Sequence, residues 1–188
     1  MTVGYHTFDA GRADQLERAG RRYRFLSAEE LLWSLSLSPD DTVADLGSGT
    51  GFFTDDVAPH AGEVHAVDVQ EAMHEYYREK GVPENVALVT SDVSDLPFDD
   101  DALDAAFSTM TYHEFASDDA LAEIRRVLAP DGRLVVVDWA STGSGEDGPP
   151  VDERYSADEA ATALRDAGFD IEHEAVRPET FLLIATLE

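Results

Sequence analysis

Two spacings of apolar residues alternate along the chain and predict strands and helices in turn. Short continuous apolar runs that end at a polar residue or a glycine predict buried strands. These strands are expected at 42–46, 64–68, 86–89, 103–107, 134–137, 171–176 and 181–186. Between them, apolar residues recur three or four positions apart, which predicts helices with one buried face. Such helices are expected after Ser27, Gly51, Ser117 and Ser156, and over 71–80.

The alternation of strands and helices predicts a doubly wound, Rossmann-like α/β sheet of seven strands with helices on both faces. Only residues 177–180 separate the last two strands, whereas a parallel crossover needs about a dozen residues. We therefore expect a hairpin there and one antiparallel strand in a mostly parallel sheet. The 188 residues can form a single domain over 1–188, with residues 1–26 as an N-terminal arm or lid.

The first predicted strand, Thr42–Leu46, leads directly into a turn with three alternating glycines, Gly47, Gly49 and Gly51. Glycine tolerates positive φ and lets a ligand lie against the main chain, near the free N–H groups of the next helix. The turn therefore predicts a nucleotide cleft.

Neighbouring residues narrow the choice of nucleotide. A dinucleotide-binding turn would need a third glycine at the position of Phe52. A triphosphate-binding loop would need a lysine after its glycines, but the only lysine of the chain is Lys80. The carboxylate of Asp45 would repel a pyrophosphate, yet it suits a ligand that carries an ammonium and a sulfonium. S-adenosylmethionine (SAM) carries both.

Residues 45–51, Asp-Leu-Gly-Ser-Gly-Thr-Gly, resemble the first motif of the class I SAM-dependent methyltransferases. Residues 123–134 resemble a later helix-turn-strand signature of that family, and the resemblance continues over nearly the whole chain. It implies methyl transfer from SAM with release of S-adenosylhomocysteine (SAH). Residues 138–139 and 148–154 are similar to those of small methyltransferases of the ubiquinone and menaquinone biosynthesis type, which implies a small-molecule acceptor.

The predicted cofactor contacts follow the carboxyl ends of the strands. Asp68 ends the second strand, 21 positions after Gly47, where its carboxylate can accept both ribose hydroxyls; capping of the next helix is the alternative. The resemblance implies that Asp92 and Val93 contact the adenine. Ser108 is expected beside the methyl, because it stands where the strand order reverses. The full predicted set is Asp45, Gly47, Ser48, Gly49, Gly51, Asp68, Val69, Asp92, Val93 and Ser108.

His113, after the fourth predicted strand, is the candidate general base, because imidazole titrates near neutral pH and can take a proton from the acceptor. The alternative is a pocket wall or a structural hydrogen bond, since orientation of the reactants can by itself accelerate methyl transfer. The predicted substrate pocket consists of Tyr112, Glu114, Asp138, Trp139 and Arg154. No metal site is expected, because the histidines are scattered over different elements.

The N-terminal arm is rich in arginine. Five of the thirteen basic residues lie between Arg12 and Arg24. Their pattern allows a helix whose arginines pair with the acidic body of the protein. It equally allows a lid over the cofactor or the substrate. The lid contacts would then be Tyr5, His6, Phe8 and Tyr23.

The net charge is −27, from 40 acidic and 13 basic residues, and there is no cysteine. Dispersed carboxylates with almost no lysine resemble the proteins of halophilic organisms. This charge opposes binding to nucleic acid or to anionic membranes, and the lack of cysteine excludes disulfides and thiolate chemistry. No apolar run approaches about 18 residues and the first residues lack a signal-peptide pattern, so a cytoplasmic protein is expected.

Three other functions remain open at this point. An aminopropyltransferase on the same fold would use decarboxylated SAM, although the acidic motif expected near its fourth strand is not found. A nicotinamide dehydrogenase is disfavoured by Phe52. A non-catalytic SAM-binding regulator would bind the cofactor and form no SAH.

Overall fold

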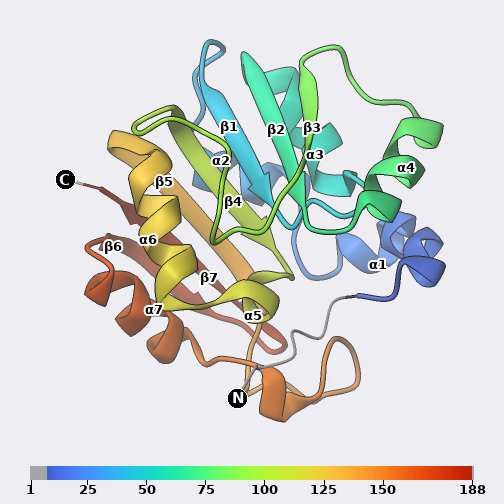
Figure 1. The fold of residues 1–188 in the computed structure, drawn as a ribbon. Coiled ribbons are helices and arrows are strands. Elements are labelled where there is room, and N and C mark those ends of the chain that lie inside the picture. The colour runs from blue at the N-terminus through green and yellow to red at the C-terminus, as the bar shows by residue number, and fades with distance from the viewer. Residues whose placement is uncertain (1–7, 188) are drawn as a thin grey trace.

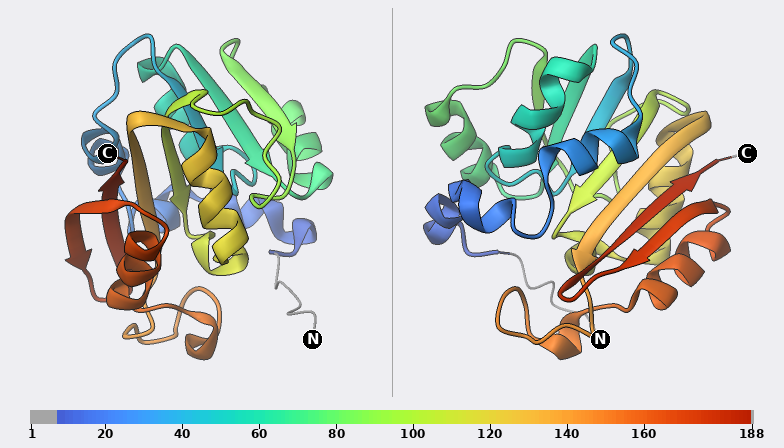
Figure 2. Two further views of the ribbon diagram at one scale, coloured as in Figure 1. Left: turned by 60° about the vertical axis from the view of Figure 1, so that its left-hand side comes forward. Right: turned by 180° about the vertical axis from the view of Figure 1, so that it is seen from behind.

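The structure, a computed structural model, describes residues 8–187. It contains a twisted seven-stranded sheet with helices on both faces (Figure 1, Figure 2). The strands are β1 (Thr42–Leu46), β2 (Glu63–Asp68), β3 (Val86–Thr90), β4 (Leu103–Thr109), β5 (Leu128–Trp139), β6 (Asp170–Val176) and β7 (Thr180–Thr186). Their order across the sheet is β3-β2-β1-β4-β5-β7-β6, which confirms the predicted fold class.

Helices connect these strands and cover two apolar faces. They are η1 (Ala10–Glu17), α1 (Ala19–Arg22), α2 (Ala28–Leu35), α3 (Phe52–Val57), η2 (Ala58–His60), α4 (Glu71–Lys80), α5 (Tyr112–Phe115), α6 (Asp118–Val127), η3 (Val151–Glu153) and α7 (Ala157–Asp166). Apolar side chains of α2 and α3 pack in one core cluster, and those of α6 and α7 pack in the other. The sheet lies between the two clusters, as the spacing of apolar residues predicts.

The hairpin predicted at the end of the chain is present. Strand β7 runs antiparallel to both β5 and β6, whereas the pairs among β1 to β5 are parallel. The connection between β6 and β7 is too short for a crossover, so the chain can only turn back on itself. The single antiparallel strand is therefore confirmed.

The strand order reverses beside β1, and this reversal positions the site. From β1 the chain moves outward to β2 and β3, then returns to place β4 on the other side of β1. Asp45 of β1 pairs with Ala66 of β2 and with Phe107 of β4. Open α/β sheets hold ligands in the crevice that such a reversal leaves at the carboxyl ends of the strands. The glycine turn after β1 lies at this crevice.

Two local features differ from the sequence expectation. Strand β5 was expected over 134–137, but it begins at Leu128, because the turn at 130–132 is contained within the strand as an irregularity of pairing. Asp131 has φ 63° there, and its N–H donates to the carbonyl of Leu187. The four-residue helix α5 was not predicted, since one turn carries no periodic pattern.

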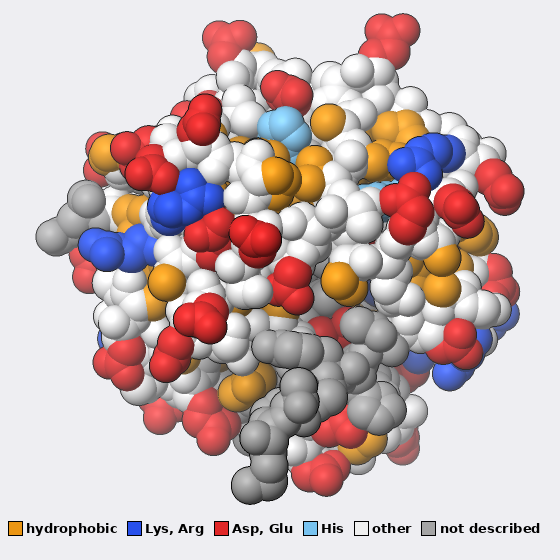
Figure 3. Space-filling model, in the orientation of Figure 1, with side chains coloured by type: hydrophobic (Ala, Val, Ile, Leu, Met, Phe, Trp, Pro, Cys, Tyr) orange, Lys and Arg blue, Asp and Glu red, His pale blue; other side chains and the backbone are white. Residues whose placement is uncertain are grey.

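Acidic side chains are spread over the face of the molecule seen in Figure 3, with few basic ones among them. This distribution agrees with the net charge of −27. Among residues 8–187, no helix combines the length and apolar character needed to span a bilayer.

Candidate active site

The three glycines after β1 have different neighbours. All have positive φ, at +79° for Gly47, +55° for Gly49 and +77° for Gly51. A Cβ on Gly47 would lie 2.3 Å from Thr111, and one on Gly51 would lie 2.0 Å from the ring of Tyr77. A Cβ on Gly49 would meet only Leu16, at 3.3 Å. Gly47 and Gly51 are thus required by the protein's own packing, and Gly49 is the least crowded of the three.

A first cavity, of about 190 Å³, opens at this turn. Seven of the ten predicted cofactor contacts line it, namely Gly47, Ser48, Gly49, Asp68, Val69, Asp92 and Val93. The other three, Asp45, Gly51 and Ser108, are not among its lining residues. Asp45 and Ser108 are buried behind the wall. All three glycines were expected to expose the main chain to a ligand, but Gly51 does not line the cavity.

Asp68 is held in place by the glycine turn itself. Its Oδ2 accepts from the backbone N–H of Gly49 at 2.8 Å, and its Oδ1 accepts from that of Gln70 at 2.9 Å. Burial raises the pKa of Asp68, and these two hydrogen bonds partly offset that effect. Each carboxylate oxygen retains a further lone pair, so the side chain can accept two more hydrogen bonds from a ligand in the cavity.

Asp45 lies beneath the turn. Its Oδ2 accepts from the hydroxyl of Thr54 at 2.6 Å, whereas its Oδ1 is buried and has no hydrogen-bond partner within the described residues. Burial raises the pKa of this carboxyl to about 7, despite the opposing effects of Thr54 and Arg22. Ionisation of a buried carboxyl that lacks part of its hydrogen bonds destabilises the folded state.

The raised pKa of Asp45 predicts a pH-dependent loss of stability. The pKa of Asp45 is about 7 in the folded form and has its ordinary value of 3.8 in the unfolded chain, so this contribution to stability is lost as pH rises between these two values. Asp45→Asn removes the titration. Relative to the native protein, we expect this variant to gain about 2 kcal/mol in unfolding free energy between pH 5 and pH 8.

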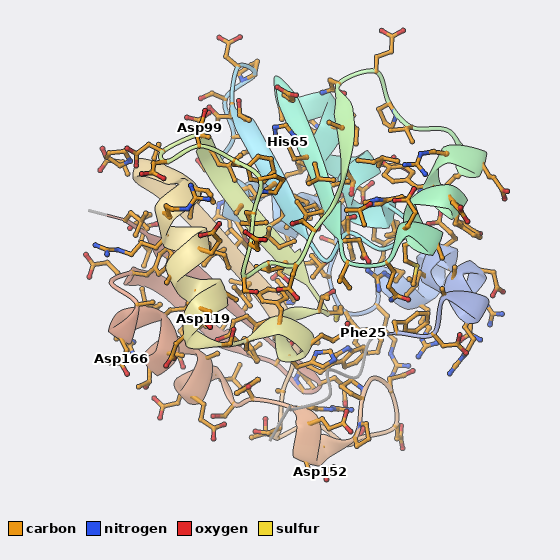
Figure 4. The ribbon with its side chains drawn as sticks, in the orientation of Figure 1. Phe25, His65, Asp99, Asp119, Asp152 and Asp166 are labelled. Atoms are coloured by element: carbon orange, nitrogen blue, oxygen red, sulfur yellow. The ribbon has the colours of Figure 1, made fainter. Side chains whose placement is uncertain are left out.

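Chemical denaturation of the ligand-free protein at the two pH values measures this gain. The matched control is Asp99→Asn, because Asp99 is exposed and lies far from the arm (Figure 4). An equal gain in both variants would trace the effect to net charge and would contradict the assignment to Asp45.

The N-terminal arm covers the first cavity. Phe8, Leu16 and Arg22 from the arm line the cavity. The arm is anchored through Glu17, which accepts from the hydroxyl of Thr50 and pairs with Lys80 at 3.2 Å. These contacts favour the lid interpretation of the arm over the plain arginine-rich helix.

The other predicted arm contacts are placed differently. Tyr23 donates its hydroxyl to Asp56 and does not line the cavity. Tyr5 and His6 lie outside the described residues. Of the four predicted lid contacts, Phe8 is therefore the one that the structure places at the site.

Arg22 is a site residue that the sequence reasoning did not single out. Its Nε is buried without a hydrogen-bond partner among residues 8–187, and its guanidinium lies 4.9 Å from the ring centre of Phe53. Burial lowers its pKa to about 10, so it remains a cation at neutral pH. The concentration of arginines in the arm of a strongly acidic chain was the available signal.

A second cavity, of about 470 Å³, adjoins the first. Its walls include Phe25 and Trp139, whose rings meet edge to face with centres 4.7 Å apart, and residues 148–150. Figure 4 shows Phe25 between the carboxyl edge of the sheet and the segment that carries Asp152. The residues that line both cavities are Phe8, Leu16, Arg22, Met110 and Glu114. The two cavities therefore share a wall.

A wider groove of about 1670 Å³ runs between α6 and α7. It is lined by charged side chains such as Arg125 and Asp158 and contains none of the predicted site residues. It lies away from the reversal of strand order. The cavities beside the glycine turn are therefore the candidate site.

His113, at the second cavity, is fixed by Asp138. Asp138 is fully buried and accepts from the backbone N–H of His113 at 2.6 Å and from its Nδ1 at 3.0 Å. Burial alone would lower the pKa of His113, but the hydrogen bond to Asp138 and the charges of Asp138, Glu114 and Glu153 outweigh it and raise the pKa. The Nε2 of His113 lies 3.9 Å from Glu114 Oε1.

Glu114 lies beside His113 and lines both cavities. Burial raises the pKa of its carboxyl to about 7, although the charge of His113 acts in the opposite direction. Two titratable side chains thus stand together where the cavities meet, and either protonation state of Glu114 is accessible near neutral pH.

The structure divides the predicted substrate-pocket residues into two groups. Glu114 and Trp139 line the second cavity, whereas Tyr112, Asp138 and Arg154 do not. Tyr112 is buried against Phe115 and Tyr155. It therefore belongs to the core.

Asp138 and Arg154 support the second cavity from behind its wall. Asp138 holds His113, as described above. Arg154 is buried and donates to the carbonyls of Pro149 at 2.9 Å and of Asp147, which braces the loop that carries Gly148. A Cβ on Gly148 would lie 2.5 Å from the Trp139 ring, so the braced loop is packed directly on that ring.

The fold and the cavities at its strand reversal are those of a nucleotide-binding α/β protein. A family profile described as a methyltransferase domain matches residues 44–136. The crystal structure of a SAM dependent methyltransferase from Aquifex aeolicus matches with a TM-score of 0.86 and 30% identity, over 97% of this chain and 100% of that chain.

The curated proteins that the chain matches include other methyltransferases. An uncharacterized methyltransferase-like protein of Schizosaccharomyces pombe is 38% identical over 96 residues, which is 50% of this chain and 37% of that protein. The demethylmenaquinone methyltransferase of Clavibacter sepedonicus is 30% identical over 148 residues, which is 78% of this chain and 53% of that protein. This chain spans between 18% and 54% of the first curated relatives that it matches. It belongs to the class I SAM-dependent methyltransferase family, whose cofactor is SAM.

The side chains at the first cavity fit SAM. Arg22 Nε and Ser48 Oγ, which have no hydrogen-bond partner among residues 8–187, suit the carboxylate of the methionine part. The buried carboxyl of Asp45 behind the turn favours a cationic group such as the ammonium. The carboxylate of Asp68 suits two ribose hydroxyls. These residues would hold the cofactor, and Asp92 and Val93 stand at the end of the cavity expected for the adenine.

Proposed function

We propose that this protein transfers the methyl group of SAM to a small, largely flat acceptor in the second cavity. One observation carries the proposal: the two cavities share Met110 and Glu114, so an acceptor in the second cavity would meet a cofactor in the first. Phe25 and Trp139 both line the second cavity, and this supports a flat acceptor, because planar molecules stack on aromatic side chains. The name of the Clavibacter relative, a demethylmenaquinone methyltransferase, supports the same class.

Bound SAM would supply an electrophilic methyl carbon on a sulfonium. The residues of this chain would bind both reactants, orient them in line, exclude water and accept a proton from the acceptor. Holding two reactants in line can be worth about 7–11 kcal/mol of the barrier. The arm, through Phe8 and Leu16, closes both cavities from one side and supports the exclusion of water.

The net charge of −27 supports a small-molecule acceptor over nucleic acid, because phosphate contacts need clusters of lysine and arginine. Arg22 also bears on the aminopropyltransferase alternative. Its Nε, which is buried without a hydrogen-bond partner among residues 8–187, suits a carboxylate that decarboxylated SAM lacks. Arg22 therefore favours SAM as the bound form.

The function is tested by calorimetric titration with SAM, followed by incubation with a panel of phenols, catechols, hydroquinones and hydroxybenzoates. We expect SAM to bind and SAH to form with at least one acceptor, as detected by mass spectrometry. The control is Gly49→Val, which places a branched side chain at φ +55° beside Leu16 and should abolish SAM binding.

Each other outcome has a distinct meaning. Binding of SAM without SAH from any acceptor would favour the non-catalytic regulator. Tighter binding of decarboxylated SAM would favour the aminopropyltransferase. Failure of the native protein to bind SAM would overturn the proposal.

A further inference from the structure

We infer that Glu114 is the catalytic base of the proposed methyl transfer, and that the His113–Asp138 pair is a fixed positioning group beside it. This inference rests on the proposed function and reverses the sequence-based expectation that His113 is the base. It follows from which side chain stands where the methyl group must pass.

Among the described residues that line both cavities, Glu114 alone can act as a base. The methyl group must cross from the first cavity to the second, so the attacking atom of the acceptor lies at the wall common to both. Phe8, Leu16 and Met110 cannot take a proton, and Arg22 is a cation without a free lone pair. Glu114 is the one shared residue of the described chain that can accept a proton. His113 lines the second cavity alone.

His113 is fixed by hydrogen bonds and favoured in its protonated form. Its backbone N–H and its Nδ1 are both committed to the buried carboxylate of Asp138. Burial lowers the pKa of His113, but the hydrogen bond to Asp138 and the charges of Asp138, Glu114 and Glu153 outweigh it and raise the pKa, which favours the imidazolium. An imidazolium has no lone pair with which to take a proton. As a cation 3.9 Å from Glu114 Oε1, it favours the ionised form of Glu114 and orients it.

Glu114 is surrounded by charged groups of both signs. Its carboxyl faces groups from several elements. These are His113 on α5, Asp138 on β5, Asp68 on β2 and Arg22 on α1, with Asp9, Arg12 and Glu153 along the same cavity. Burial raises the pKa of Glu114 to about 7, His113 lowers it, and Asp68 and Asp138 raise it. The side chain is therefore able to gain and lose a proton at neutral pH.

The proton and electron balance is simple. As the acceptor attacks, its X–H proton moves to a carboxylate oxygen of Glu114. The freed electron pair forms the bond from X to the methyl carbon. The electrons of the broken sulfur–carbon bond remain on sulfur, which becomes a neutral thioether. Glu114 then releases the proton to solvent through the second cavity.

A test that needs no acceptor uses the difference between SAM and SAH. Both carry the same ammonium and carboxylate, so the effects of Asp45 and Arg22 on these two groups cancel in the ratio of their Kd values. Only SAM carries the sulfonium, which an ionised Glu114 attracts. The ratio is measured by calorimetry at fixed salt from pH 5.5 to 8.5. We expect the Kd of SAM to fall by about tenfold relative to the Kd of SAH as Glu114 ionises.

Variants assign this change to a residue. Glu114→Gln is expected to make the ratio independent of pH. His113→Gln is expected to keep the change but move its midpoint to higher pH, because the stabilising cation is gone. Asp99→Asn, which removes an exposed acid that lines neither cavity, is the control for a change in net charge and should keep the native change. If His113→Gln unfolds because Asp138 loses its partner, the double variant with Asp138→Asn gives the same comparison.

Failure of this inference is separable from failure of the proposed function. A pH-dependent ratio that persists in Glu114→Gln, or that disappears in His113→Gln, overturns the assignment while SAM binding stands. With an acceptor in hand, Glu114→Gln should lower kcat by about 100-fold or more with little change in SAM affinity at low pH. His113→Gln should regain activity at higher pH, whereas loss at every pH would identify His113 as the base.

Discussion

Gly51→Ala is expected to destabilise the protein by about 3 kcal/mol, from backbone strain of about 1–2 kcal/mol and overpacking of about 1–3 kcal/mol. Gly51 has φ +77°, and a Cβ there would lie 2.0 Å from the ring of Tyr77. Tyr77 has little room to move, because it is fully buried and donates its hydroxyl to Asp55 at 2.6 Å. Unfolding by urea, monitored by circular dichroism, measures the loss.

Two other glycines separate the contributions to this loss. Gly81→Ala has φ +106° but meets nothing within 4 Å, so it should show the backbone strain alone. Gly20→Ala lies in α1 with open space around it and should be neutral or slightly stabilising. If Gly51→Ala cost no more than Gly81→Ala, the overlap with Tyr77 would be relieved without penalty and the packing explanation would be wrong.

Asp68→Ala is expected to weaken SAM binding by about 100-fold, because each charge-assisted hydrogen bond to a ribose hydroxyl contributes about 1.5–3 kcal/mol. The variant also releases the N–H groups of Gly49 and Gln70, which Asp68 now accepts from. The turn would therefore lose order as well as a ligand contact. Calorimetric titration with SAM gives the change in Kd directly.

The matched control for Asp68→Ala is Asp95→Ala, which removes the same charge from an exposed position outside the cavity. Its SAM affinity should equal that of the native protein. A melting temperature for each variant shows whether the fold persists. If the Kd of Asp68→Ala for SAM were within about threefold of the native Kd, the loss of binding free energy would be less than about 0.7 kcal/mol. Such a result would show that this carboxylate does not bind the ribose.

Sequence patterns predicted the sheet well, because buried parallel strands are continuous apolar runs whose ends are marked by polar residues or glycine. Strand β1 was placed at its observed limits, and β2 within one residue. The first part of β5 escaped prediction, because Pro130, Asp131 and Gly132 indicate a turn and the strand absorbs that turn. Local propensity cannot reveal pairing that only the neighbouring strand provides.

The candidate site was predictable where it follows the carboxyl ends of strands. The position of Asp68 at the end of β2 is fixed by the spacing of one βαβ unit. Ser108 is buried and does not line the cavity, whereas its neighbour Thr109 does, because successive side chains of a strand point to opposite faces. Arg22 was not predicted as a wall residue, since its position depends on contacts between the arm and distant elements such as Lys80.

The arm contributes Phe8, Leu16 and Arg22 to the walls of both cavities. Swinging it aside to admit one reactant would therefore dismantle the chamber of the other. A closed arm would then enclose both reactants at once, so methyl transfer would proceed in a complex that holds the nucleoside and the acceptor together.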